Sequence, residues 1–411
     1  MTNDIMQKSL IYESLYSSDF RKSEISKIIG FLSSFQPLSL IGLPRVGLAR
    51  VLRYILTHPE LLEKKLKSQK ILLLEIDLND MFNFTEKDFW QLILKRVSDQ
   101  ANSKEINDLY LSAGRTNDAF TFFDNTKRAI RLLCSNDFLV FLLFNRFDRV
   151  FSIFSYLFFA HLQSLKDIAK QKINFFFTLN RPLEFLFPDA LRGGNLEVFS
   201  QKYFLKPGTF VDLLAVIGEF ERSRKVKLSE KIKTIAFEYS GGHAQYCLLI
   251  LQILENNKYS LKNIDDLFKK DPEIWQQNLE LWDYLALEEK EALLNKKIPQ
   301  ESFLYQIGLV DSKGEIFNPL FKDFVEKQKE FTKSTGQELT LKEKKLFQIL
   351  KDREGEIILR EEIINFVWPE KAEKVNEWTL DQLIKRLRKK LVLLKIESRV
   401  KTVKNQGYKL I

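Results

Sequence analysis

The chain has 411 residues, a length that allows two to four domains, and 45% of them are hydrophobic, which is enough for sizeable buried cores. Its 64 Lys and Arg residues outnumber 55 Asp and Glu residues, so the formal net charge is +9. The two cysteines, Cys134 and Cys247, are far apart and only three histidines occur, so the composition argues against a disulfide framework or a metal site and fits a cytoplasmic protein with no cofactor.

Residues 37–56 predict an apolar strand, a loop with Gly42 and Gly47, and then a helix. This is the layout of the phosphate-binding loop G-x-x-x-x-G-K-[ST], in which backbone N–H groups, the lysine and the hydroxyl hold phosphates and Mg²⁺. We call Gly42–Ala49 the P-loop frame. Leu48 stands at the lysine position and Ala49 at the hydroxyl position, so both chemical groups are missing.

The continuous apolar run 138–144 predicts a buried parallel strand. Two acidic residues would follow this strand in an active ATPase, to hold Mg²⁺ and activate water, but Asn145 and Arg146 stand there. The nearest carboxylate is that of Asp148, which we expect to cap or pair locally. Because four chemical positions are changed together, we predict that the chain is not an enzyme and hydrolyses no ATP.

Some nucleotide binding could survive through Arg45, Arg50 or the loop amides. The apolar stretch Phe138–Leu162 is also long enough to suggest a membrane span, but it contains two arginines and an aspartate near its middle. Because a bilayer disfavours such charges by several kcal/mol, we expect a buried strand followed by a helix, and no membrane.

A further strand is predicted at 173–179, followed by Asn180-Arg181, and a Gly-Gly-His segment lies at 241–243. In order and spacing, the P-loop frame, the second strand and this segment resemble the STAND-type AAA+ ATPases, with Ala244 in place of the family's proline. The resemblance covers about residues 20–254 and implies a P-loop-like parallel sheet with helices. The alternative is an unrelated α/β domain with a glycine turn.

The middle of the chain predicts mostly helices. We expect a P-loop NTPase-like domain at 1–200, a helical lid-like subdomain at 201–270, and a winged-helix module at 271–328. The third of these begins its pattern with an amphipathic helix at 282–294, and by resemblance to STAND proteins it packs rather than binds DNA. A polar linker is predicted at 329–338.

The last segment, 339–411, predicts three helices and a hairpin. Thr340 and Glu343 form a capping box at the start of the first helix. The second helix stops at Trp368-Pro369, because proline cannot continue it. The third helix spans 379–391, and the chain then ends in a hairpin-like wing.

The third helix is amphipathic. Leu380, Ile384, Leu387 and Leu391 share one face, and the opposite face holds polar and basic residues, namely Gln382, Lys385, Arg386 and Lys389. From residue 339 onward, 18 Lys or Arg residues face 11 Asp or Glu residues, so this segment holds +7 of the chain's +9. Such a basic face attracts the phosphate backbone of DNA. The alternative is a solvated basic helix without a partner.

This segment resembles the winged-helix output domain of the OmpR/PhoB family of response regulators, through the capping box, Trp368, the third helix and the Gly407-Tyr408 end of the wing. The resemblance implies that the third helix enters the major groove and the wing touches the minor groove. The family usually has histidine where Leu383 stands and glycine where Asn405 stands. The DNA-binding residues that we predict are Thr379, Gln382, Lys385, Arg386, Arg388, Lys389, Lys401, Thr402, Lys404, Asn405 and Tyr408.

The fold class expected is thus a multidomain α/β plus α+β protein with a C-terminal winged helix-turn-helix. The function expected is a sequence-specific, DNA-binding transcription regulator with an inactive NTPase-like sensor or scaffold. Double-stranded DNA is the expected partner, with RNA polymerase and a second copy on DNA as candidates. Two alternatives remain: a nucleotide-binding switch that uses non-standard site residues, and a protein-interaction scaffold.

Overall fold

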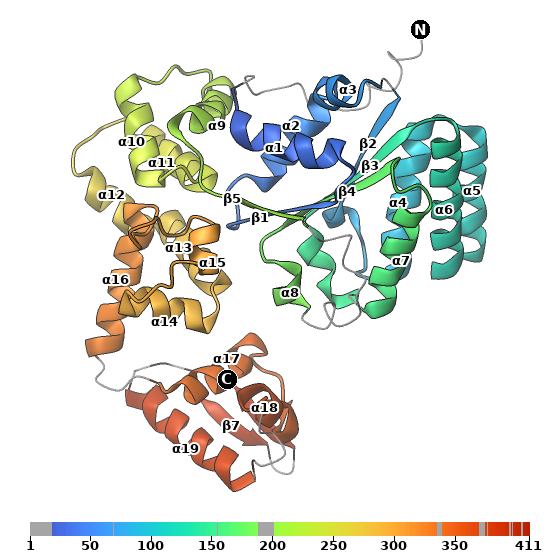
Figure 1. Cartoon of the computed structure of the whole chain (residues 1–411). Coiled ribbons are helices and arrows are strands. Elements are labelled where there is room, and N and C mark those ends of the chain that lie inside the picture. Colours follow the sequence, from blue (N-terminus) through green and yellow to red (C-terminus); the bar gives the residue numbers. More distant parts are fainter. Residues whose placement is uncertain are drawn as a thin grey trace. The chain divides into compact units, whose positions relative to one another are not determined.

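The computed structural model describes residues 19–68, 70–153, 155–187, 201–334, 339–369, 375, 377–393, 396, 398–403 and 406–411, without the side chains of 330–334, 378, 389, 392 and 393. The chain divides into two compact units, Met1–Asp323 and Phe324–Ile411 (Figure 1). No helix among the described residues is long and apolar enough to cross a membrane.

The first unit is built on a five-stranded sheet in the order β2-β3-β4-β1-β5, with every neighbouring pair parallel. Its strands are β1 (Leu38–Gly42), β2 (Ile71–Asp77), β3 (Leu139–Asn145), β4 (Ile173–Leu179) and β5 (Gln201–Leu205). β1 and β4 are buried along their whole length, as expected for apolar strands covered on both faces. The strands predicted from the apolar runs at 138–144 and 173–179 are therefore confirmed.

Helices cover both faces of this sheet (Figure 1). They are α1 (Lys22–Ser33), α2 (Leu48–Thr57), α3 (Glu60–Leu66), α4 (Glu86–Ala101), α5 (Lys104–Thr116), α6 (Ala119–Ser135), α7 (Tyr156–Asp167) and α8 (Leu183–Leu186), with 3₁₀ turns η1 (Leu78–Asp80) and η2 (Phe147–Ile153). On the face of α4, stacked phenylalanines fill the core: Phe144 lies 5.7 Å from Phe89 and 5.1 Å from Phe177, centroid to centroid. Many of the chain's phenylalanines thus serve packing.

The rest of the first unit is helical: α9 (Phe210–Arg224), α10 (Glu230–Ser240), α11 (Ala244–Asn256), α12 (Ile264–Lys270), α13 (Pro272–Tyr284), α14 (Leu287–Asn295), α15 (Phe303–Gln306) and the start of α16 (Pro319–Ser334). Two predictions need correction. The helix expected at 282–294 is two helices, because Glu289 accepts a hydrogen bond from the Ala286 N–H at 2.8 Å and starts a new helix there. The linker expected from 329 begins inside a helix, since 329–334 belong to α16.

The second unit contains α17 (Leu341–Asp352), β6 (Ile358–Leu359), α18 (Arg360–Val367), α19 (Glu377–Leu393), β7 (Val400–Val403) and β8 (Gly407–Leu410). The strands form an antiparallel sheet in the order β6-β8-β7. The predicted capping box is confirmed: the Glu343 N–H donates to Thr340 Oγ1 at 3.4 Å, and the Thr340 N–H donates to Glu343 Oε2 at 2.7 Å. The three helices and the wing have the predicted order.

Candidate functional site

The P-loop frame has the predicted strand–loop–helix geometry. Gly42 ends β1, and a Cβ atom there would lie 2.9 Å from the carbonyl oxygen of Leu205 in β5. Gly47 precedes α2 with φ of 119°, which only glycine adopts readily. Both glycines are therefore required by the backbone, whatever the loop binds.

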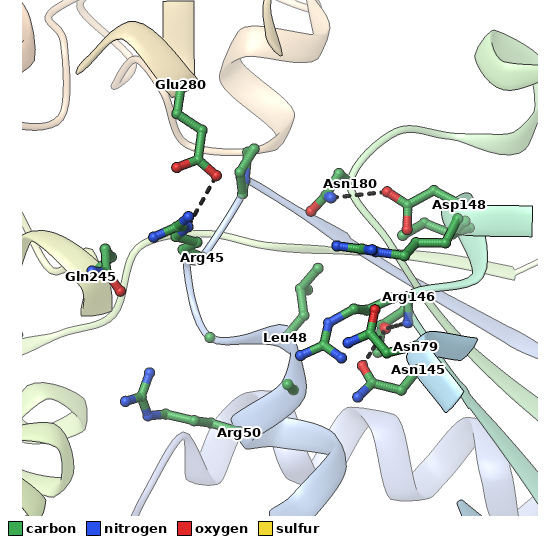
Figure 2. A pocket seen from close by; sticks show the side chains of 16 residues that line it. Arg45, Leu48, Arg50, Asn79, Asn145, Arg146, Asp148, Asn180, Gln245 and Glu280 are labelled. Carbon is green, nitrogen blue, oxygen red and sulfur yellow. Dashed lines mark hydrogen bonds and ion pairs between the residues drawn. The ribbon is translucent and has the colours of Figure 1, made fainter. Parts of the chain in front are cut away.

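Leu48 and Ala49 line a cavity of about 470 Å³ above the carboxyl ends of β1, β3 and β4 (Figure 2). The residues that line it are Pro44, Arg45, Gly47, Leu48, Ala49, Arg50, Asn79, Asn145, Arg146, Asp148, Arg149, Thr178, Leu179, Asn180, Gln245 and Glu280. The cavity lies where parallel α/β sheets usually bind ligands, because the strand ends and helix starts converge there.

The two residues after the apolar part of β3 form a hydrogen-bonded network with the end of β2. Arg146 Nη1 donates to both oxygens of Asp77, at 3.0 and 2.9 Å, and Asn145 Nδ2 donates to Asp77 Oδ2 at 3.2 Å. Thr178 Oγ1 donates to Asn145 Oδ1 at 3.2 Å and accepts from the Arg146 N–H at 2.8 Å. A guanidinium thus stands where the sequence pattern of an ATPase places a carboxylate.

Asp148 lies at the cavity and accepts a hydrogen bond from Asn180 Nδ2 at 2.9 Å. Burial raises the pKa of its carboxyl group, and hydrogen bonds offset only part of that effect. The expected local pairing is therefore present. Across the cavity, Arg45 Nε donates to Glu280 of α13 at 3.0 Å (Figure 2).

The Gly-Gly-His segment packs against the P-loop frame. His243 Nε2 lies 3.0 Å from the carbonyl oxygen of Pro44, so this nitrogen carries the proton and donates. Complete burial lowers the pKa of His243 to about 4. A Cβ atom on Gly242 would lie 2.0 Å from the Gly208 carbonyl oxygen, so the backbone there approaches too closely for any side chain.

The end of β4 is joined to the α13–α14 region. Arg181 donates to both carboxylate oxygens of Glu289 at 2.7 Å and to the Tyr284 carbonyl at 2.6 Å. The Tyr284 hydroxyl donates to the Asn180 carbonyl at 2.6 Å. Because Asn180 and Glu280 both line the cavity, a bound ligand would touch elements of the sheet and of the helical region together.

In the second unit, α19 presents the predicted faces. Leu380, Ile384, Leu387 and Leu391 are buried in the core. Lys385 and Arg386 are exposed, whereas Gln382 and Thr379 are half-buried. The side chain of Lys389 lies outside the described residues. Leu383, at the position of the family's histidine, is buried in the core as well.

The wing has exposed Lys401 and Thr402 on β7, whereas Lys404 and Asn405 lie outside the described residues. Arg388 of α19 donates to the Val400 carbonyl at 2.9 Å and to Thr402 Oγ1 at 2.7 Å, so it ties the helix to the wing. The interpretation of Tyr408 as a wing contact needs correction: its side chain is 2% exposed and its hydroxyl donates to Asp381. Pairing of β8 with β6 and β7 turns this ring into the core.

Several cavity residues were not identified from the sequence. Asn79, Arg149, Gln245 and Glu280 come from four separate segments, and no motif connects them. Asn180 directly follows the predicted strand, which is the one signal that could have pointed to it.

Comparison with known proteins gives a family match for part of the second unit and several similar solved structures. Residues 334–410 match the family model described as "Transcriptional regulatory protein, C terminal". No curated protein matches the chain. Similar solved structures include the ORC1 protein of Aeropyrum pernix in complex with DNA (11% identity, 95% of this chain and 88% of that chain, TM-score 0.42) and Cdc6p of Pyrobaculum aerophilum (13%, 99% and 93%, 0.41).

A third similar structure is described as a Walker-type ATPase of Pyrococcus abyssi (12% identity, 95% of this chain and 93% of that chain, TM-score 0.39). The prediction that the chain is not an enzyme is corrected by this finding. A protein described as an ATPase is among the similar structures, and the residues at the four changed positions, Leu48, Ala49, Asn145 and Arg146, do not by themselves establish inactivity.

The first unit has a parallel five-stranded sheet covered by helices, with the P-loop frame at the end of β1. The second unit has the helix order, the wing and the family match of an OmpR/PhoB-type output domain. The match to a transcriptional regulatory protein's C-terminal domain thus belongs to residues 334–410, and the first unit carries a parallel α/β sheet with the P-loop frame.

Proposed function

We propose that this chain regulates transcription by binding a specific DNA sequence through α19 and the wing, under the control of the first unit. The observation that carries the proposal is the exposed basic face of α19, with Lys385 and Arg386 beside a buried leucine face. A helix of this kind fits the major groove, where side chains can distinguish base pairs.

The residues fall into three roles. Lys385 and Lys401 supply charge for phosphates, whereas Gln382 and Arg386 have the hydrogen-bonding groups that read base edges. Arg388 positions the wing through its bonds to β7. RNA polymerase and a second copy of the chain on an adjacent DNA site are the protein partners that we propose.

The first unit is proposed as the control element. A ligand in its cavity would contact the P-loop frame and Glu280 of α13 at once, and Arg181 holds α14 to the end of β4. A ligand that favours one arrangement of these elements shifts the population toward it. In the chain, α14 is followed by α15 and then by α16, which leads to the winged helix.

The test is DNA binding by the full-length protein over a range of salt concentrations. Fluorescent duplexes from the region upstream of its own gene are compared with scrambled duplexes, for the wild type, the double variant Lys385→Ala/Arg386→Ala, and Arg353→Ala. Arg353 is a suitable control because its charge is already offset by Glu356 and Glu362, at 2.9 and 2.7 Å.

We expect the wild type and Arg353→Ala to prefer the upstream duplex. The double variant should lose that preference because Arg386 no longer contacts base edges, and the slope of log affinity against log salt should fall by about 1, because Lys385 no longer neutralises a phosphate. Weak and equal binding of every duplex by the wild type would contradict sequence-specific regulation.

A further inference from the structure

At this cavity the P-loop frame has the backbone geometry of a phosphate-binding loop, but it lacks the lysine and the hydroxyl of that loop. Phosphate binding by such a loop normally depends on the lysine and on Mg²⁺ held by a hydroxyl and carboxylates. We infer that this cavity binds a di- or triphosphate group without a divalent cation, with arginines supplying the positive charge. The inference deepens the proposed control role, on which it rests, by naming the class of ligand.

The backbone still offers donors for an anion. Leu48 and Ala49 form the start of α2, and N–H groups in the first turn of a helix have no partner within the helix. Both residues line the cavity. The positive end of the helix dipole adds to this attraction for phosphate.

Arginines surround the cavity. Arg45 and Arg50 come from the P-loop frame and the start of α2, and Arg146 and Arg149 come from the segment after β3. Only two carboxylates, those of Asp148 and Glu280, are among the described lining residues. Arg45, Arg50 and Arg146 already pair with Glu280, Glu219 and Asp77, at 3.0, 3.4 and 2.9 Å, so a phosphate would share these guanidinium groups with carboxylates. The planar guanidinium group can bind two phosphate oxygens at once, so it can take the place of a lysine at such a loop.

The nearby carboxylates already accept hydrogen bonds from side chains. Asp77 accepts from Arg146 and Asn145, Asp148 accepts from Asn180, and Glu280 accepts from Arg45. A Mg²⁺ ion needs near-octahedral oxygen ligands, so it would have to displace these donors and lie close to the Arg146 guanidinium. The donor set therefore fits a bare phosphate group better than a metal-bound one.

Arg146 can bind a ligand while it stays paired with Asp77. It holds Asp77 through Nη1 alone, and its side chain is 40% exposed at the cavity that Leu48 also lines (Figure 2). The cavity volume of about 470 Å³ lies within the usual range of small-molecule sites. A second cavity, which Gly47, Arg50 and Asp212 line, has a volume of only about 10 Å³ and holds no more than about one water, so it is too small for a phosphate group.

The experiment is titration calorimetry on the full-length protein without DNA. The probes are ATP, ADP and inorganic triphosphate, each measured with EDTA and with MgCl₂. The variants are Arg146→Ala, Arg45→Ala and the matched control Arg128→Ala. Arg45 and Arg128 are similar surface residues, 55% and 59% exposed, each paired with one carboxylate, at 3.0 and 2.8 Å, but Arg128 does not line the cavity.

We expect at least one probe to bind in EDTA with an affinity no lower than in MgCl₂. Arg45→Ala and Arg146→Ala should weaken it about tenfold or more, and Arg128→Ala should leave it unchanged. Thermal unfolding separates a folding defect in Arg146→Ala from a binding defect. Tighter binding of ATP or ADP than of triphosphate would identify a nucleotide, and equal binding would identify a polyphosphate.

Three results would overturn the inference: binding that requires Mg²⁺, binding of none of the probes, or equal effects of Arg45→Ala and Arg128→Ala. Because these measurements contain no DNA, their failure would leave the test of DNA binding by α19 unaffected.

Discussion

The P-loop frame and the winged helix keep different parts of the patterns that they resemble. At the P-loop frame the glycines and the strand–loop–helix geometry are present, but the lysine and hydroxyl positions hold Leu48 and Ala49. In the winged helix, the buried leucines and the exposed basic residues of α19 are both present. The P-loop frame has the geometry of its pattern without the lysine and the hydroxyl, whereas the winged helix has the geometry and the basic helix face but not the family's histidine at Leu383.

The difference shows which positions the fold itself controls. Gly42 and Gly242 are fixed by carbonyl groups at distances that exclude a side chain. Leu48, Ala49 and Arg146 line an open cavity, so their exchange leaves the sheet and its helices intact. The glycine positions therefore indicate the fold, whereas the ligand-binding chemistry of residues that line a cavity or a surface has to be tested for each residue.

The largest expected effect is on the backbone of the Gly-Gly-His segment. Gly242→Ala should destabilise the first unit by about 3 kcal/mol or more, because the new Cβ would lie 2.0 Å from a carbonyl oxygen at a φ of 83°. In Gly47→Ala the new Cβ atom would have no neighbour within 4 Å, so the stability of the first unit should fall only by the backbone strain, about 1 kcal/mol. Thermal unfolding measures the stability of both variants, and equal losses of stability would show that the close contact at Gly242 has no effect.

The next effect depends on pH. His243 has its pKa lowered from 6.5 to about 4 by burial, so the unfolded chain binds a proton between these values that the folded chain does not. Stability of the first unit should therefore fall as the pH drops from 6.5 to about 4, by up to about 3 kcal/mol. His243→Gln keeps a donor for the Pro44 carbonyl and cannot titrate. A stability difference between wild type and variant that stays constant with pH would refute this assignment.

A smaller effect distinguishes Arg388, which positions the wing, from Lys385, which supplies charge for DNA binding. Arg388→Ala should lower the stability of the second unit by about 1–2 kcal/mol and weaken DNA binding, because the bonds to β7 are lost. Lys385→Ala should weaken DNA binding without changing stability, since Lys385 is exposed. Unfolding and DNA titrations are measured for both variants. An unchanged unfolding temperature for Arg388→Ala would mean that its bonds to the wing do not matter.

The smallest effect concerns Tyr408. Tyr408→Phe removes the hydroxyl that donates to Asp381 and should cost about 1 kcal/mol of stability while leaving DNA affinity unchanged. Denaturant unfolding and DNA titration of the same sample test this. A loss of affinity as large as that of Lys385→Ala would restore Tyr408 as a DNA contact.

Local patterns were enough to predict several elements. The apolar runs predicted β3 and β4, because strands buried on both faces need continuous hydrophobic sequence. The capping box at Thr340 and the leucine spacing of α19 were predicted for similar reasons, since each depends on residues only three or four positions apart. The break between α13 and α14 was missed, because the amphipathic pattern continues across it while Glu289 caps a new helix.

The sequence by itself determined the positions where backbone geometry or a helical face demands a residue type, such as Gly47 and Leu387. Only the tertiary structure decided which distant side chains meet, because the strand order brings together ends that are separated by many residues. Asp77 binds Arg146 because β2 and β3 pair in the sheet with their ends in register. Glu280 binds Arg45 because the fold places α13 beside the P-loop frame. Tyr408 is buried for the same reason: β-sheet pairing, and not its place in the sequence, sets the direction of its ring.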